Sequence, residues 1–469
     1  MNTTRIRQAR VRADGASVTA QLCEYVVDAR YEAVPDDVRE LAKLSVLDAV
    51  ACMVGGSTLA PSRIAFDLFA EMGGVPEATI FGTDRRLPVL HAAYLNSASA
   101  NALDFDDTAS GHPGATVIPP ALAIAEKQRS SGRQLLLAIV LGYEVGLRVV
   151  SAIQPSTERW RQVSSSATPQ TFGAVTAASK LLGLTLDQTQ IAFGLAGSGA
   201  PVPSIRKFGT RDGGPISWLK NNYGASSWSG VLAAQLAARH FIGPKTILDG
   251  AHGFWIMAGS DQCDFDEFVR GLGDEYWIRR VSFKPYSCCR YLHAAVDAVR
   301  LICSEAQLDV DEIREIRVAS IAHLATFTNY QPLNPFDIEF SLPYALALTA
   351  LGVPPGYAWL SSETLSNPHV AALARKVHVV VDPDAEQRFA AGHPHETTVT
   401  ISTESEQFEK RIGVALGHPR NPLGPDALYA KFRRLVDPVW GEARASALLE
   451  RIAQLETCKD VSMLFHETA

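Results

Sequence analysis

Helical periodicity in the first half of the chain constrains the fold more than any other feature of the sequence. Apolar residues recur at helical spacing after Pro35, and this pattern stops at Gly55-Gly56. The same spacing predicts further helices over residues 134–150, 171–182 and 228–238. Many interior positions of these segments are Ala, Gly or Ser, whose small side chains let helices approach closely. The first half therefore predicts a compact helical bundle.

The pattern changes after about residue 280. Segments with the alternation or the β-branched composition of strands lie at residues 313–321, 377–381, 397–403 and 408–414. The last two are joined by a short polar link and predict a hairpin. Helical segments are predicted between the strands, near residues 343–351 and 366–376.

These patterns predict a mainly α fold with two domains. A large all-α helical domain is expected to take residues 15–279 together with 413–465, because helical sequence resumes at Asp426. A smaller α+β domain is expected to take residues 280–412.

Composition and charge argue against several classes of function. The chain has 469 residues and a formal net charge of −7, which disfavours a nucleic-acid partner. No run approaches the ~18 uninterrupted apolar residues of a membrane helix, so no membrane partner is expected. The seven cysteines are odd in number and irregularly spaced, which favours a reducing compartment. We therefore predict a cytoplasmic protein.

The stretch from Ala102 to Pro113 concentrates the polar chemistry of the chain. Its ionisable and hydroxyl-bearing residues are Asp104, Asp106, Asp107, Thr108 and His112. Apolar, small-residue sequence lies on both sides, and buried carboxylates cost free energy unless they are partnered. A proton-transfer site, a metal site and a helix-end network are all compatible with this clustering. Capping of the next helix and catalysis weigh equally on these residues alone, whereas no metal-ligand spacing accompanies them.

The motifs that usually hold cofactors are missing from the sequence. No phosphate-binding loop, no Gly-x-Ser-x-Gly elbow and no His-Glu-x-x-His segment occurs. We therefore expect no bound nucleotide, flavin or catalytic zinc.

Four stretches together resemble the MmgE/PrpD family, which includes 2-methylcitrate dehydratases, cis-aconitate decarboxylases and iminodisuccinate epimerases. These stretches begin at Ala102 (ALDFDDT, then His-Pro), Ser282 (SFKPYSCCRYLH), Phe340 (FSLPYA) and Gly417 (GHPRNPL). The resemblance implies a cofactor-independent enzyme of small polycarboxylates. It also implies a homodimer, with a large all-α domain, a smaller α+β lid domain and a site in the cleft between them.

The resemblance also implies roles for individual residues. Lys284 would stabilise an enolate-like species beside a carboxylate, where a fixed cation is needed. His112 would act as acid or base, since imidazole titrates near neutral pH. Tyr344 would donate a proton or bind a carboxylate, Asp104 would orient or activate a neighbour, and Thr108 would hold a substrate oxygen. This assignment requires the aspartate-rich stretch and Lys284 to converge in the fold.

Two departures from the family pattern affect the predicted reaction. Ser164 stands near the place of a histidine that several members carry, and Asn222 replaces a second histidine. Lys220 falls within one residue of the family lysine and is expected, with Arg290 and Ser164, to bind substrate.

We predict a carbon–oxygen lyase, a hydro-lyase similar to 2-methylcitrate dehydratase, that dehydrates a citrate-type hydroxy acid through a stabilised carbanion. Decarboxylation of a cis-aconitate-like acid and epimerisation of an acidic carbon stay open as alternatives. A non-catalytic ligand-binding or scaffold protein is the alternative from another class.

Overall fold

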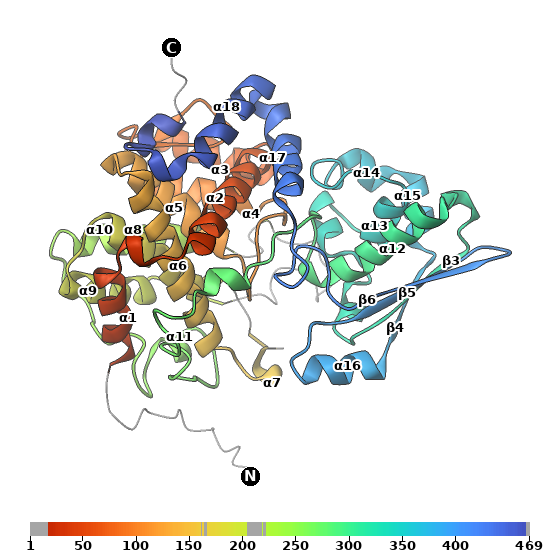
Figure 1. Cartoon of the computed structure of the whole chain (residues 1–469), viewed down its shortest axis with the longest axis horizontal. Helices are drawn as coiled ribbons and strands as arrows, with labels where there is room; N and C mark the ends of the chain where they lie inside the picture. The colour runs from red at the N-terminus through yellow and green to blue at the C-terminus, as the bar shows by residue number, and fades with distance from the viewer. Residues whose placement is uncertain (1–16, 161, 164–166, 204–217, 219–221, 466–469) are drawn as a thin grey trace, which may run out of the picture.

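A body of helices and a separate lobe built around a sheet make up the computed structural model of the chain (Figure 1). The structure describes residues 17–160, 162–163, 167–203, 218 and 222–465. The helices of the body before residue 280 are α1 (Val18–Asp28), α2 (Asp36–Gly56), α3 (Ala60–Met72), α4 (Val89–Asn101), α5 (Pro113–Gln128), α6 (Gly132–Ala152), α7 (Thr157–Trp160), α8 (Ala167–Leu181), α9 (Leu186–Ser198), α10 (Tyr223–Ala237) and α11 (Phe254–Met257).

The four helices predicted for the first half are confirmed as α2, α6, α8 and α10, with ends shifted by a few residues. Local signals fix several of these ends. Ser131 and Gln134 form a capping box at the start of α6, and the acidic residues Asp36 and Asp37 occupy the first turn of α2. Gly183, with φ of +64°, follows the end of α8.

The helical part is not purely α, because a short antiparallel ribbon joins α3 to α4. Its strands are β1 (Ala78–Thr79) and β2 (Arg86–Leu87). Two residues per strand give too little alternation for the sequence to predict. Irregular turns also replace regular helix over most of residues 238–292, apart from α11 and short 3-10 turns.

Helices α6 and α8 cross closely at the centre of the body. Gly142 and Gly146 on α6 face Gly173 on α8, where an added Cβ at Gly173 would lie 2.8 Å from a Val117 methyl and 3.0 Å from the Gly142 carbonyl oxygen. Small residues let the two backbones touch, as the sequence predicts. Helix α6 is long and apolar enough to cross a membrane, but 94% of its apolar window is buried among the other helices. Burial in the protein core therefore accounts for its hydrophobicity.

The lobe contains a four-stranded sheet in the order β4-β3-β5-β6. Its strands are β3 (Glu315–Ser320), β4 (Val377–Val381), β5 (Thr397–Ser402) and β6 (Gln407–Ile412), and its helices are α12 (His293–Ala306), α13 (Leu342–Ala350), α14 (Ser362–Ser366), α15 (Pro368–Ala374) and α16 (Pro383–Ala390). Strands β5 and β6 pair antiparallel from Thr397↔Ile412 to Ser402↔Gln407, which confirms the predicted hairpin. Strand β4 pairs parallel to β3, and α12 packs against β5 and β6.

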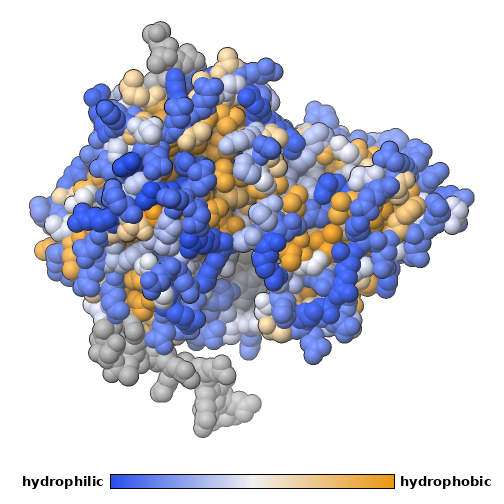
Figure 2. Space-filling model, in the orientation of Figure 1, coloured by the Kyte–Doolittle hydropathy of each residue, from blue (hydrophilic) through white to orange (hydrophobic). Residues whose placement is uncertain are grey.

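The C-terminal helices return to the helical body, where α17 (Pro425–Trp440) packs along α2 and α18 (Glu442–Ala453) packs beside α17 (Figure 1). On the face drawn in Figure 2, hydrophilic residues cover most of the surface. Hydrophobic residues gather in patches over both the body and the lobe (Figure 2). The mainly α fold class is confirmed; the boundaries at 279/280 and 412/413 stay predictions.

Replacement of Gly173 by Ala tests the close crossing of α6 and α8. We expect the variant to lose about 1–3 kcal/mol of unfolding free energy, because the methyl group must displace backbone atoms of α6. Alanine's better helix propensity offsets only about 1 kcal/mol of this. Denaturant unfolding measures the change. Gly424→Ala is the matched control, since no atom lies within 4 Å of a Cβ at that position. A Gly173→Ala protein as stable as this control would contradict the packing.

Candidate active site

Three segments that are distant in sequence converge beside the aspartate-rich loop, residues 104–112. The backbones of Thr108 and Ser282 exchange two hydrogen bonds, each of 2.9 Å. The next residue, Phe283, donates its amide hydrogen to the carbonyl oxygen of Gly417 at 3.1 Å. Gly417 has φ of +85°, and an added Cβ there would lie 1.9 Å from the Phe283 carbonyl oxygen. Only glycine fits that position, so the 415–421 turn packs directly against the segment that carries Lys284.

Lys284 and Asp104 form a buried ion pair at this junction. The Lys284 Nζ donates to the Asp104 carbonyl oxygen at 2.8 Å and to its Oδ2 at 2.9 Å, and both side chains are only 1% exposed. Burial disfavours the ammonium, but the Asp104 and Asp106 carboxylates outweigh it and raise the pKa of Lys284. Asp104 has φ of +47°, a left-handed conformation that costs about 1–2 kcal/mol for an L-residue. The ion pair thus holds the loop in a shape it would not adopt alone.

His112 lies between two carboxylates and is oriented by one of them. The Asn101 amide nitrogen lies 3.1 Å from the His112 Nδ1 and donates to Asp106 Oδ1 at 3.0 Å. Nδ1 itself lies 3.0 Å from both oxygens of Asp106. Nδ1 therefore carries the proton, and Nε2 faces Asp104, whose Oδ1 lies 3.8 Å away. The imidazole is 13% exposed. Burial disfavours the Asp106 carboxylate, but His112 and Lys284 lower its pKa below the ordinary value.

Asp107 binds a free amide group at the start of α5, the helix that begins beside His112. Its Oδ1 accepts the amide hydrogen of Gly114 at 2.8 Å, in the first turn of α5, and its Oδ2 accepts the hydroxyl of Tyr143 at 2.6 Å. The capping interpretation of the motif is therefore right for Asp107. The Gln170 amide, oriented to satisfy both its atoms, donates to the His112 carbonyl and accepts the His112 amide hydrogen. Burial is the main cause of the rise in the pKa of Asp107 to about 8, and the negative charges of Asp48 and Asp106 add to it.

A second buried lysine holds the loop from its other side. The Nζ of Lys431, on α17, donates to Asp48 Oδ1 on α2 at 2.6 Å and to the Phe105 carbonyl oxygen at 2.5 Å. It also lies 4.3 Å from the centroid of the Phe105 ring. Burial opposes the ammonium, but Asp48 raises the pKa of Lys431. Two ammonium groups thus bind the carbonyl oxygens of the consecutive residues 104 and 105.

This arrangement suits the movement of a proton beside a carboxylate. His112 has one nitrogen fixed by Asp106 and another available for proton transfer, and Lys284 places a positive charge close by. Two of the three Lys284 N–H bonds go to Asp104 among the residues described.

Asp104, Asp106 and His112 could also hold a metal ion, since one ligating atom from each lies within 4.8 Å of the others. The Lys284 ammonium already satisfies Asp104 electrostatically, so the described residues fit a cation less well.

Of the other residues that the sequence predicts for the site, one lies in the aspartate-rich loop and the others do not. Thr108 lies in the loop and donates its hydroxyl to the Gly111 carbonyl oxygen at 2.7 Å. Arg290 is partly exposed and binds the carbonyl oxygens of Ala415 and Leu416. Tyr344 is buried in the first turn of α13 in the lobe, and none of the described contacts joins it to His112 or Lys284. Ser164 and Lys220 lie outside the described residues.

Several residues that shape the site were not predicted individually. They are Asn101, Tyr143, Asp48 and Lys431, together with Tyr223, whose ring centroid lies 5.3 Å from that of His112. Asn101 is the last residue of α4, directly before the loop, and this position in the sequence could have marked it as a site residue. Asp48 and Lys431 carry no local signal, because 383 positions separate them.

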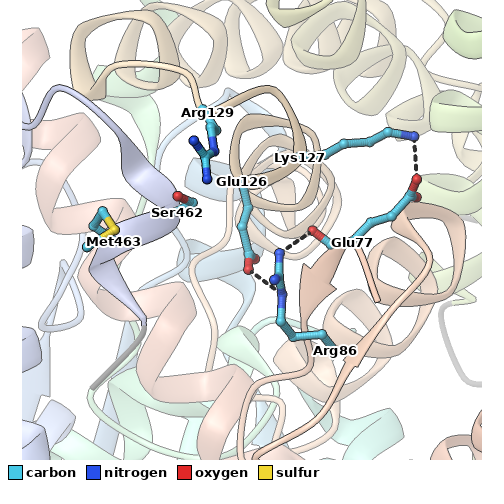
Figure 3. Close-up of a pocket in the computed structure, with 7 residues that line it drawn as sticks. All are labelled: Glu77, Arg86, Glu126, Lys127, Arg129, Ser462 and Met463. Atoms are coloured by element: carbon cyan, nitrogen blue, oxygen red, sulfur yellow. Dashed lines mark hydrogen bonds and ion pairs between the residues drawn. The ribbon is translucent and has the colours of Figure 1, made fainter. Parts of the chain in front are cut away.

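A cavity of about 300 Å³ lies away from this site, between the β1–β2 ribbon, the end of α5 and the C-terminal residues (Figure 3). Its lining residues are Glu77, Arg86, Glu126, Lys127, Arg129, Ser462 and Met463. Arg86 pairs with Glu126 at 3.1 Å and Lys127 with Glu77 at 2.7 Å. The third cation of the lining, Arg129, lies 3.8 Å from Asp460, which is outside the lining. None of the predicted site residues lines this cavity.

Comparison with known proteins identifies the family. The sequence model of the MmgE/PrpD N-terminal domain matches residues 20–265, and that of the MmgE/PrpD C-terminal domain matches residues 286–457. The chain therefore belongs to the MmgE/PrpD family.

Among curated proteins, the chain is similar to cis-aconitate decarboxylases of fungi and mammals. It is 25% identical to the Aspergillus terreus (strain NIH 2624 / FGSC A1156) protein, over 96% of this chain and 95% of the relative. It is also 25% identical to the Homo sapiens protein, over 96% and 94%. For the Mus musculus protein, the identity is 27% over 82% and 80%.

Replacement of Lys431 by Met tests the second ion pair. We expect a loss of about 3–5 kcal/mol of unfolding free energy, because Asp48 would be left buried without a partner. Denaturant unfolding measures this loss. The double variant Lys431→Met with Asp48→Asn is the matched control and is expected to recover most of it. Equal stability of the single variant and wild type would contradict the assignment.

Asp107 predicts a pH dependence of stability with a definite sign. Its folded pKa of about 8 exceeds the ordinary value, so the folded state keeps a proton that the unfolded state has lost. The contribution of Asp107 to stability therefore falls as pH rises through this window. Asp107→Asn removes this pH-dependent contribution. The unfolding free energy of the variant is therefore expected to rise relative to that of wild type between pH 5 and 8, by at most about 1.4 kcal/mol per pH unit.

Urea unfolding at several pH values measures the difference between wild type and Asp107→Asn. Asp426→Asn, at an exposed position, is the control and should show a difference that does not vary with pH. If the difference in unfolding free energy between wild type and Asp107→Asn also did not vary with pH, Asp107 would not be protonated in the folded state.

Proposed function

We propose that the protein is a lyase that acts on a small polycarboxylate through a carbanion beside a carboxylate, without a cofactor. Family membership supports a lyase of small acids at the level of the family. The observation that carries the proposal here is the buried constellation of Lys284, Asp104, His112 and Asp106.

Fixed charge supports the formation of a carbanion at this position. An electron pair left on a carbon next to a carboxylate delocalises onto the carboxylate oxygens, which then carry more negative charge. The Lys284 ammonium is held rigidly by two bonds to Asp104, so it needs no reorganisation when that charge develops. Its burial keeps the electrostatic interaction strong, because little water screens it.

His112 is proposed as the group that moves the proton. The Asp106 carboxylate accepts its Nδ1 hydrogen and stabilises the doubly protonated imidazolium. In the neutral imidazole Nε2 can take a proton from carbon, and in the imidazolium Nε2 can give one to carbon. Asn101 fixes Asp106 in turn, so the imidazole is oriented before a substrate binds.

Decarboxylation of a cis-aconitate-like acid is the reaction that the relatives favour. The carbon–carboxylate bond breaks, carbon dioxide leaves, and the electron pair remains on carbon. His112 as imidazolium then gives its Nε2 proton to that carbon. Every atom and electron in this step is supplied by the substrate and by His112.

Dehydration of a citrate-type hydroxy acid is the second candidate, and the departures at Ser164 and Asn222 from the family pattern favour it. Here His112 takes a proton from carbon and hydroxide leaves the neighbouring carbon, taking up a proton as water. Tyr344 is the proposed proton donor for that hydroxide. The relatives do not support dehydration specifically.

The lid role of residues 280–412, the homodimer and the cytoplasmic location remain part of the proposal. The contacts of the Lys284 segment with both the aspartate-rich loop and the 415–421 turn support a site between the body and the lobe. Light scattering of the purified protein measures the oligomeric state directly.

His112→Asn tests the proposed chemistry. Asparagine keeps an N–H near the position of Nδ1, so the bond to Asp106 and the fold are expected to survive. Loss of the second nitrogen should lower turnover by about 10²–10⁴-fold. The assay follows a panel of citrate, 2-methylcitrate and cis-aconitate, in which released carbon dioxide identifies decarboxylation and new double-bond absorbance identifies dehydration.

Thermal unfolding of His112→Asn and of wild type is compared to check that the variant keeps its fold. Wild-type rates in this variant would contradict the role of His112. Absence of turnover across the panel, with ligand-induced thermal stabilisation of the wild type, would favour a non-catalytic binding protein instead.

A further inference from the structure

The segment that follows the buried Lys284 becomes partly exposed at Cys289 and Arg290. Residues 286–288 are buried, whereas Cys289, Arg290 and Tyr291 are partly exposed. Arg290 begins the short 3-10 turn η4 (Arg290–Leu292), which precedes α12. Burial lowers the pKa of the His293 imidazole, and the positive charges of Arg290 and Lys284 both lower it further, so the two cations lie at the same junction.

Arg290 is a cation whose described partners are all uncharged. Its Nη1 binds the Leu416 carbonyl oxygen at 2.7 Å and His293 Nδ1 at 2.9 Å, and its Nη2 binds the Ala415 carbonyl oxygen at 3.2 Å. His293 accepts this bond as a neutral imidazole, because its Nε2 donates to the Cys288 carbonyl oxygen at 3.1 Å. These bonds fix the guanidinium in place without neutralising it.

The carboxylate that influences Arg290 most is occupied elsewhere. Asp297 Oδ1 accepts the Tyr286 hydroxyl at 2.6 Å, and its Oδ2 accepts the Leu416 amide hydrogen at 2.7 Å. Among the residues that the structure describes, no ion pair joins Arg290 to a carboxylate. Burial, only partly offset by Asp297, lowers the pKa of Arg290 to about 10.

Several imidazole groups also lie beside this turn. His395 Nε2 donates to the Tyr291 carbonyl oxygen at 3.0 Å, and the Tyr291 ring lies 5.4 Å from the His395 ring and 4.6 Å from that of His323. His418 follows the 415–416 carbonyl groups that Arg290 binds. Burial lowers the pKa of His395 to about 4, and the positive charge of Arg290 contributes.

This turn also lies where the lobe meets the helical body. The ring of Trp160, at the end of α7 in the body, lies 5.3 Å from that of His323 in the lobe. A rigid guanidinium that has no carboxylate partner among the described residues, and that lies at this boundary, suits the binding of an anion.

We propose that Arg290 forms a second carboxylate subsite, which binds the substrate carboxylate farthest from the reacting carbon and selects tricarboxylates over dicarboxylates. His395 is a positioning residue for it, because its bond to the Tyr291 carbonyl oxygen fixes the turn that presents the guanidinium. The inference rests on the proposed function for the identity of the ligand, a small polycarboxylate.

Calorimetric binding of two unreactive acids tests this subsite independently of turnover. Propane-1,2,3-tricarboxylate carries the additional carboxylate, and propane-1,2-dicarboxylate lacks it. We expect Arg290→Gln to weaken binding of the tricarboxylate at least tenfold and binding of the dicarboxylate less than twofold. Arg290→Lys, which keeps the charge but not the forked geometry, should fall between Arg290→Gln and wild type.

His395 has its own pair of variants. His395→Ala is expected to reduce the preference for the tricarboxylate, and His395→Gln to restore it, because a glutamine amide can still donate to the Tyr291 carbonyl oxygen. Arg317→Gln and His378→Gln, at exposed positions of the sheet, are the matched controls and should bind both acids as wild type does.

Equal weakening of both acids in Arg290→Gln, unchanged binding of the tricarboxylate, or failure of the wild type to bind it would overturn the subsite. Turnover by the wild type without any dependence of selectivity on Arg290 would leave the proposed lyase intact and remove the subsite alone. Arg290-dependent selectivity in a protein that turns over none of the panel would support the subsite and contradict the lyase.

Discussion

Two buried ammonium groups hold one loop, and the rest of the candidate site depends on that restraint. Lys284 binds the carbonyl oxygen of Asp104 and Lys431 binds that of Phe105, each with its own aspartate partner. Either charge alone would be expensive to bury, and each is stabilised only because helices or segments from distant parts of the chain meet there. The loop is therefore shaped by tertiary structure, including the left-handed conformation of Asp104.

The same loop divides its carboxylates between structure and chemistry. Asp107 caps α5 and binds Tyr143, whereas Asp106 orients His112 and Asp104 pairs with Lys284. A single short motif thus begins the helix that fixes His112 and places the groups that could move a proton. Rigid support of this kind is what electrostatic stabilisation of a carbanion requires.

Sequence patterns predicted the parts of the structure that local chemistry controls. Helices with apolar periodicity and clear end signals, such as α2 and α6, and the β5–β6 hairpin were predicted close to their ends. The β1–β2 ribbon was not, because its strands are too short to show alternation. At the candidate site, the aspartate-rich motif pointed to Asp104 and His112, and Lys284 came from the family resemblance alone. The Lys431–Asp48 pair depends on contacts across 383 positions and leaves no local pattern.

The source of the hydrogen that reaches carbon tests the central claim most directly. Turnover in deuterium oxide, followed by NMR or mass spectrometry of the recovered acids, shows whether a solvent-exchangeable group delivers it. For the proposed decarboxylation, the account predicts a single solvent deuterium on the carbon next to a carboxylate in the wild-type product, and loss of that incorporation in His112→Asn together with turnover. A decarboxylated acid formed at the wild-type rate without solvent deuterium, or labelled equally by the variant, would contradict the role of His112 as the proton donor.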